Sequence, residues 1–250
     1  MITKVAIIAI TDEGKKTARI LLKSFKKARL NGRLFSKHGR LNDLVGNIFN
    51  KFDGLIFIMS LGIVVRVIAQ CLKDKHTDPA VVVVDEGKRF AISTISGHEG
   101  GANELAVKVA NILGAEPVIT TASESKKNIV IGIGSKRNVK KEEIINAVKY
   151  ALTSVKCSIN KVRCIATIDL KQNETGLKNA CLELGIPLRI ISSELLKNFT
   201  GKYNRSSLVQ EKIGVEGVCE PCSIIVARNP KLILPKTKLG RVTVAVVREN

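Results

Sequence analysis

The stretch AVVVVDEGKRFAISTISGHEGGANELA, residues 80–106, decides how the first half of this chain folds. Its two runs rich in β-branched residues, 80–84 and 90–95, meet at Glu86-Gly87. Two such runs joined by a glycine-containing turn predict a β-hairpin. The direction of this hairpin then determines which loops of the sheet lie together.

A helix is predicted directly after the hairpin. Apolar residues recur at helical spacing from Ala102 to Leu113, and Gly114 follows as a C-cap. The strand therefore passes to the helix through a glycine-rich turn, residues 96–101, with His98 near its centre.

Apolar strands alternate with helical patterns on both sides of this stretch. In the first half we expect strands at 4–10, 54–60 and 117–122 and helices at 12–30, 41–49 and 62–73. In the second half we expect strands at 129–134, 163–170, 187–191 and 239–247 and helices at 141–152 and 174–184. The pattern predicts two α/β domains, 1–122 and 129–250, joined by a linker at 123–128. The first has a mostly parallel sheet, helices on both faces and one hairpin.

Ligands of open α/β sheets bind beyond the carboxyl ends of the strands. If the strand 80–84 runs antiparallel to its neighbours, residues 90–95 return to the shared edge. Ser96-Gly97-His98 would then lie beside Ser60-Leu61-Gly62, with Thr120 and Thr121 at the end of the last strand. Helix N-termini at such an edge favour anions, and glycines let a ligand approach the backbone.

Histidine is the usual proton shuttle near neutral pH, so His98 is a candidate base, although a solvated loop histidine is the alternative. His38 and His76 lie among lysines and are expected at the surface. Arg66 is charged within an apolar run, which favours a carboxylate ligand or a structural ion pair. The glycines of the turn are also explained by turn geometry alone.

The chain is strongly basic. It has 41 Lys and Arg against 22 Asp and Glu, a formal net charge of +19. This imbalance indicates an anionic partner, such as a polycarboxylate, a phosphate or a nucleic acid. Aromatic residues make up only 4%, which weakens the nucleic-acid interpretation. The apolar runs are too short to span a bilayer and the N-terminus does not resemble a signal peptide, so we expect a cytoplasmic protein without membrane association.

Two further motifs resemble a metal site and a dinucleotide-binding site, but each is incomplete. Cys219 and Cys222 have metal or redox spacing, but no second pair completes a zinc site, so we expect buried structural thiols and no metal. GIGSKRN (132–138) lacks the third glycine of a dinucleotide fingerprint, so Lys136 and Arg137 indicate a generic anion site instead.

Residues 59–106, followed by LGAEPVITTAS (113–123), resemble the N-terminal domain of the cobalamin biosynthesis protein G family, the cobalt-precorrin-5A hydrolases. IGIGSKR, IATIDLKQNETGL, GVCEPCSIIVA and LILPKTKLGRVTVAVV resemble that family's C-terminal domain. A middle segment that many members carry is almost absent. Three departures stand out: Glu99 replaces a leucine, Ser135 replaces a common cysteine, and Cys219 and Cys222 replace alanines.

The resemblance implies an enzyme of the anaerobic route to the corrin ring. It opens the lactone of cobalt-precorrin-5A and expels acetaldehyde, giving cobalt-precorrin-5B. The implied substrate is a cobalt tetrapyrrole fringed with carboxylates, which offers a partner for the positive charge. No cofactor of the protein's own is implied, because the cobalt belongs to the substrate.

The resemblance also implies roles for residues. His98 is the first candidate for the general base and Glu104 the second, with Asn103 as an orienting group or oxyanion donor and backbone N–H groups near Gly100-Gly101 stabilising the oxyanion. His98 as an axial ligand of the substrate's cobalt stays open. The expected substrate-binding residues are Gly62, Arg66, Ser96, Gly97, Gly100, Gly101, Thr120 and Thr121 in the first domain and Lys136, Arg137, Lys171 and Glu220 in the second.

Other classes of function stay open from sequence. The chain could be a non-catalytic tetrapyrrole carrier or a basic RNA-binding module, and a homodimer is compatible with it. Lys171 and Glu220 could serve an interdomain salt bridge instead of a ligand.

Overall fold

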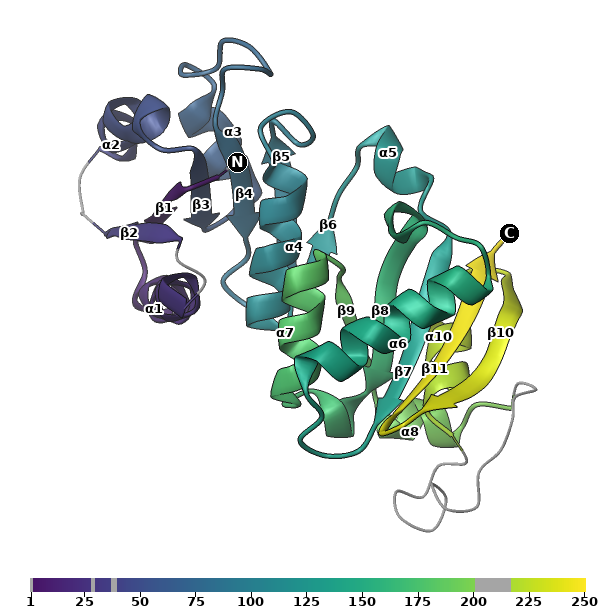
Figure 1. Ribbon diagram of the computed structural model, residues 1–250. Helices are drawn as coiled ribbons and strands as arrows, with labels where there is room; N and C mark the ends of the chain where they lie inside the picture. Colours follow the sequence, from purple (N-terminus) through teal and green to yellow (C-terminus); the bar gives the residue numbers. More distant parts are fainter. Residues whose placement is uncertain (1, 28–29, 37–39, 201–216) are drawn as a thin grey trace. The chain divides into compact units, whose positions relative to one another are not determined.

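The structure, a computed structural model, describes residues 2–27, 30–36, 40–200 and 217–250. The chain divides into two compact units, Met1–Thr121 and Ala122–Asn250, each built around one sheet (Figure 1). The predicted fold class, two α/β domains with a mostly parallel first sheet, is confirmed. A four-residue helix, α5 (Ala122–Ser125), overlaps the expected linker at 123–128.

The sheet of the first unit has the strand order β2-β1-β3-β4-β5-β6. Its strands are β1 (Lys4–Ile8), β2 (Asn31–Phe35), β3 (Gly54–Ile58), β4 (Ala80–Val84), β5 (Phe90–Ile95) and β6 (Glu116–Val118). All neighbouring pairs are parallel except β4 and β5, which form the predicted hairpin.

The predicted direction of this hairpin is wrong. β4 pairs parallel to β3, from Gly54 opposite Ala80 to Ile58 opposite Val84. The chain between these strands contains α3 and is long enough to be a crossover connection, which returns the chain to the starting edge and makes the next strand parallel. The reversal therefore falls on β5, and β5 and β6 run opposite to β1–β4.

Helices cover both faces of this sheet, as Figure 1 shows. α1 (Asp12–Lys27) and α4 (Ala102–Leu113) pack on one face, and α2 (Leu41–Ile48), the 3₁₀ turn Phe49–Lys51 and α3 (Leu61–Ile68) pack on the other. α3 ends earlier than the predicted 62–73. The predicted end of α1, near residue 30, cannot be compared because residues 28 and 29 lie outside the described part of the chain.

The sheet of the second unit has the order β10-β11-β7-β8-β9. Its strands are β7 (Ile129–Ser135), β8 (Val162–Ile168), β9 (Leu188–Ile191), β10 (Pro230–Leu239) and β11 (Val242–Glu249). Its helices are α6 (Lys141–Ser154), α7 (Thr175–Leu184), α8 (Ser193–Lys197) and α10 (Cys219–Val226), with 3₁₀ turns at Ile159–Lys161 and Asp169–Lys171. β7, β8 and β9 are parallel, and β11 pairs antiparallel to β7.

The two glycines of GIGSKRN lie inside strand β7 rather than in a phosphate-binding loop. A Cβ at Gly132 would lie 1.7 Å from the carbonyl oxygen of Cys219, so α10 packs directly on this strand. Close packing of a helix explains this glycine. No helix of the described residues is long and apolar enough to cross a membrane.

Candidate active site

The glycine-rich turn between β5 and α4, residues 96–101, forms a compact loop that we call the His98 loop. The carbonyl oxygen of Ser96 accepts hydrogen bonds from the N–H groups of Gly100 at 3.1 Å and Ala102 at 3.2 Å. Gly101 stands at the N-cap of α4 with φ 83°, a conformation that favours glycine. The loop therefore closes on itself.

Asn103 fixes the loop to the sheet. Its side chain is 8% exposed; its Oδ1 accepts a hydrogen bond from the Ser93 hydroxyl at 2.8 Å, and its Nδ2 donates one to Thr121 Oγ1 at 3.0 Å. A Cβ at Gly97 would lie 2.9 Å from Asn103 Oδ1, so only glycine lets the loop cross this amide without displacement. Asn103 thus joins β5, α4 and the segment after β6 beneath the loop.

His98 and Glu99 are exposed at the tip of the loop, and Glu104 is exposed in the first turn of α4. The imidazole of His98 makes no hydrogen bond or ion pair with any described residue, so both ring nitrogens are available to a ligand. Glu99 contacts Lys75 at 3.4 Å. Its own backbone N–H and the Lys75 ammonium lower the pKa of Glu99, which makes its carboxylate a weaker base.

Three backbone N–H groups of the His98 loop, those of Gly97, His98 and Gly101, have no partner among the described residues. Free N–H groups in one small loop before a helix can stabilise a developing oxyanion. The N–H group of Gly100 was expected to stabilise the oxyanion as well. It is not free to do so, because it already donates to the carbonyl oxygen of Ser96.

The prediction that the Ser96 side chain binds the substrate directly does not agree with the structure. It adopts φ 55°, is 7% exposed, and its Oγ is buried without a hydrogen-bond partner among the described groups. The hydroxyl has no exposed surface in this conformation. Ser96 shapes the loop through its carbonyl oxygen instead.

The His98 loop lies at the edge where β1, β3 and β4 begin and where β5 and β6 end. Lys75 pairs with Glu99, and a Cβ at Gly100 would lie 3.4 Å from the carbonyl oxygen of Asp78, just before β4. Asp78 in turn accepts hydrogen bonds from the N–H groups of Lys73 and Asp74. His76 in this segment is exposed, as predicted; His38 lies outside the described residues.

Gly62 is not beside the His98 loop. It lies in the first turn of α3, beyond the carboxyl end of β3, where the Thr11 hydroxyl donates to Glu86 at 2.7 Å. This is the opposite edge of the sheet, because β4 runs parallel to β3. Arg66 is exposed in the last turn of α3 and makes no ion pair with the described residues. Thr120 is exposed after β6, and Thr121, as predicted, is at the edge with His98.

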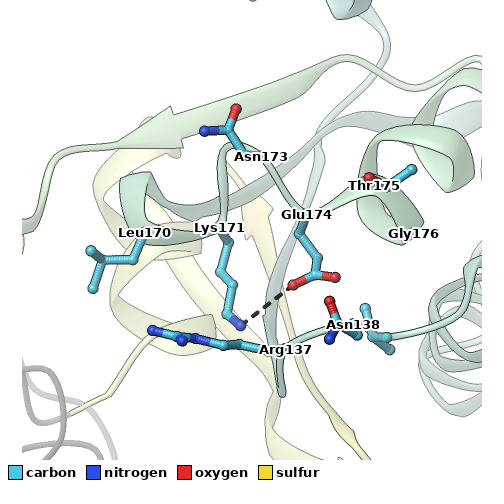
Figure 2. Close-up of a pocket in the computed structure, with 9 residues that line it drawn as sticks. Arg137, Asn138, Leu170, Lys171, Asn173, Glu174, Thr175 and Gly176 are labelled. Carbon is cyan, nitrogen blue, oxygen red and sulfur yellow. Dashed lines mark ion pairs between the residues drawn. The ribbon is translucent and has the colours of Figure 1, made fainter.

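The second unit contains a pocket of about 470 Å³ beyond the carboxyl ends of β7 and β8. Its lining residues are Arg137, Asn138, Val139, Leu170, Lys171, Asn173, Glu174, Thr175 and Gly176. Figure 2 shows the Lys171 side chain directed toward the Glu174 carboxylate, with Arg137 alongside; the ammonium and carboxylate are 3.7 Å apart. The structure thus brings together two predicted ligands, Arg137 and Lys171.

Two other predictions for this unit fall outside the pocket. Lys136 is exposed but does not line it. Glu220 is 1% exposed inside α10, and its Oε1 accepts a hydrogen bond from the Lys236 N–H at 2.5 Å. Because Glu220 is buried, its carboxylate is not accessible to a ligand in this conformation.

Sequence reasoning missed Asn138, Leu170, Asn173, Glu174 and Thr175. Four of these follow β8 in the polar stretch LKQNET, immediately before a helix, which is the signal that was available. Cys219 and Cys222 are free and buried, as predicted, and no cluster of metal-binding side chains occurs among the described residues.

Comparisons with known proteins place these features in one family. The model "Cobalamin synthesis G N-terminal" matches residues 43–124, and "Cobalamin synthesis G C-terminus" matches residues 129–247. A cobalt-precorrin-5A hydrolase of Priestia megaterium is 28% identical over 353 aligned positions, which cover 96% of this chain and 94% of that protein. The alignment is longer than this chain, so the relative carries additional residues within it.

Two other relatives carry related names. A cobalt-precorrin-5A hydrolase of Salmonella typhimurium is 44% identical over 102 residues, covering 40% of this chain and 29% of that protein. A protein of Methanocaldococcus jannaschii named "Probable cobalt-precorrin-5A hydrolase" is 26% identical over 278 residues, covering 79% of this chain and 86% of that protein. Since both family models match in order along the chain, this protein belongs to the cobalamin biosynthesis protein G family.

Proposed function

We propose that this protein is a cobalt-precorrin-5A hydrolase of cobalamin biosynthesis, which opens the substrate lactone and releases acetaldehyde. Relatives that align with most of the chain carry this name. The observation that carries the proposal is the His98 loop, where an exposed imidazole adjoins three backbone N–H groups that have no partner among the described residues. A base beside oxyanion donors is what hydrolysis of a lactone requires.

In the first step, His98 removes a proton from water as the water oxygen attacks the lactone carbonyl carbon. The carbonyl oxygen becomes an oxyanion, which the N–H groups of Gly97, His98 and Gly101 stabilise. Collapse of this intermediate breaks the ring C–O bond. The imidazolium of His98 returns its proton to the leaving oxygen, which becomes a free hydroxyl, and the new carboxylic acid ionises to a carboxylate. Asn103 holds the loop in place through Ser93 and Thr121 and does not touch the substrate.

In the second step, a base removes the proton of the freed hydroxyl. The bond between the carbinol carbon and the macrocycle then breaks, acetaldehyde leaves, and the conjugated macrocycle accepts the electron pair. His98 is suited to this step as well. The second candidate is Glu104, which is exposed in the first turn of α4. His98 as an axial ligand of the substrate's cobalt is the competing role.

The partner and setting follow from the same proposal. The substrate's carboxylates complement the net charge of +19, with Arg66 and Thr120 as exposed candidates in the first unit. We propose that the protein needs no cofactor of its own, acts in the cytoplasm and binds no nucleic acid. A homodimer is compatible with the proposal but is not required by it.

Incubation of the purified protein with cobalt-precorrin-5A, with chemical trapping of the aldehyde, tests this function. We expect stoichiometric acetaldehyde and cobalt-precorrin-5B. Binding of the substrate without aldehyde release would indicate a carrier. Salt-sensitive RNA binding without tetrapyrrole binding would indicate an RNA-binding module.

A further inference from the structure

The pocket of the second unit has a charge that suits a single carboxylate. Three of its lining residues are ionisable: Arg137, Lys171 and Glu174. Glu174 neutralises one cation through its contact with Lys171, and the guanidinium of Arg137 makes no ion pair with any described residue. The lining therefore has a net charge of +1, which one carboxylate balances and a phosphate dianion exceeds.

The two cations differ in their surroundings. The side chains of Lys171 and Glu174 are 12% and 10% exposed, whereas Arg137 is exposed at the mouth. A guanidinium binds a carboxylate through two parallel N–H groups, and Figure 2 shows the Arg137 side chain passing beside the Lys171 ammonium. Arg137 is thus placed to bind a carboxylate that enters from solvent, with the Lys171 ammonium behind it.

The size and rim of the pocket indicate that the carboxylate belongs to a larger, apolar ligand. About 470 Å³ accommodates a flexible side arm, and lies toward the lower end of the range of about 300–1,000 Å³ for small-molecule sites. Leu170 at the rim is 61% exposed, the largest exposed fraction among the large apolar residues that the structure describes. An apolar ring resting on Leu170 would cover it while an attached arm entered the pocket.

The backbone around the pocket is closely packed. A Cβ at Gly176 would lie 1.9 Å from the carbonyl oxygen of Val139, so only glycine allows the first turn of α7 to pack against the segment that carries Arg137. Asn138 in that segment adopts φ 56°. The first residues of the ten-residue helix α7, Thr175 and Gly176, line the pocket, and the positive end of the helix dipole adds to the preference for an anion.

We propose that this pocket binds one propionate or acetate arm of the tetrapyrrole, held by Arg137 and Lys171, with the face of the macrocycle against Leu170. The identity of the macrocycle rests on the proposed function, whereas the preference for a carboxylate arm on an apolar ring rests on the pocket alone. The second unit is then the part of the enzyme that recognises the substrate's periphery.

The proposal includes a dependence on pH. Burial lowers the pKa of Lys171, and the positive charge of Arg137 lowers it further. The carboxylate of Glu174 acts in the opposite direction but does not cancel the effect of burial. A bound carboxylate favours the ammonium form and raises that pKa, so binding is coupled to proton uptake. Affinity should therefore fall as the pH rises from the lowered pKa of the free protein to the higher pKa of the complex.

The test is a direct titration of the full chain with coproporphyrin, a tetrapyrrole that carries propionate arms, followed by porphyrin fluorescence. Arg137→Gln should weaken binding by about tenfold or more, as expected for loss of a charge-assisted hydrogen bond. Lys149→Gln removes the same charge from the exposed face of α6, outside the pocket, and should change binding by less than about twofold. The same porphyrin with its propionates converted to amides should bind as weakly to wild type as coproporphyrin binds to Arg137→Gln.

The double variant Lys171→Met/Glu174→Gln avoids leaving a buried carboxylate unpaired, and should lose the alkaline pH dependence of binding. Equal affinities of wild type and Arg137→Gln, equal binding of the amide porphyrin, or no binding by wild type would overturn the proposal. The proposal would also be overturned if inorganic phosphate displaced coproporphyrin at the same concentrations as propionate does. Because the titration involves no turnover, a protein that binds through Arg137 but releases no acetaldehyde would contradict the hydrolase proposal and leave this one standing.

Discussion

Replacing Asn103 by alanine should loosen the His98 loop. The side chain is almost fully buried and makes two hydrogen bonds, to Ser93 at 2.8 Å and to Thr121 at 3.0 Å. Each contributes about 1 kcal/mol net, so Asn103→Ala should lower the local stability by about 2 kcal/mol. That free energy corresponds to a roughly thirtyfold larger population of the open loop.

Hydrogen-exchange mass spectrometry on peptides that span residues 96–106 measures this change directly. The exchange of the amides of Gly100, Ala102 and Asn103, which are hydrogen-bonded within the loop, should accelerate by about thirtyfold. Asn103→Asp should recover part of the protection, because a carboxylate oxygen can still accept from Ser93 while the amide donor to Thr121 is lost. Acetaldehyde release should follow the same order: wild type, Asn103→Asp, Asn103→Ala.

Lys108→Ala, on the same helix and only half-buried, is the matched control and should leave the loop protected. Unchanged exchange in Asn103→Ala would refute the reasoning, because the loop would then be held by its backbone hydrogen bonds alone. Equal exchange in the Asp and Ala variants would show that the side-chain hydrogen bonds are not the cause.

Three further predictions follow from packing and charge. Gly176→Ala should destabilise the second unit by about 1–3 kcal/mol, because its Cβ would lie 1.9 Å from the Val139 carbonyl oxygen; a melting temperature equal to that of wild type in circular dichroism would contradict this. Burial raises the pKa of Cys219 from 9.0 to about 11, so between these pH values the folded protein retains a proton that the unfolded chain loses. The free energy of unfolding should therefore fall as the pH rises from 9.0 to about 11. Urea titrations should show a smaller fall in Cys219→Ala. Glu99→Leu should keep acetaldehyde release within about twofold of wild type, since Glu99 is exposed and its ion pair with Lys75 is an exposed one, which contributes little; a loss as large as that of a His98 variant would make Glu99 part of the chemistry.

The elements that sequence predicted well are those with continuous apolar patterns. β3, β4, β7 and β11 are buried along most of their length, and their sequences are runs of valine, isoleucine and leucine. β2 and β10 were missed because both are edge strands. Edge strands tolerate polar residues and proline, and β10 contains Pro230 and Pro235.

The arrangement of the candidate site was predicted only in part. The turn geometry of the His98 loop, and its neighbour Thr121, follow from local sequence, because strand, glycines and helix are consecutive. The edge on which the loop lies depends on whether β4 runs parallel to β3, and both directions satisfy the same hydrophobic pattern. The His98 loop was therefore assigned to the wrong edge, whereas Gly62 lies beyond the carboxyl end of β3 as predicted. Glu220 was misplaced because its partner, the Lys236 N–H, belongs to a strand that the sequence did not reveal.

The central claim is that His98, exposed at the tip of its loop, is the base that opens the lactone. The most direct test compares acetaldehyde release from cobalt-precorrin-5A by wild type and His98→Ala, with substrate binding measured in the same preparations. Loss of a general base typically lowers turnover by about 10²- to 10⁴-fold, so we expect a fall in that range with binding retained. Acetaldehyde release by His98→Ala at the wild-type rate would contradict the account.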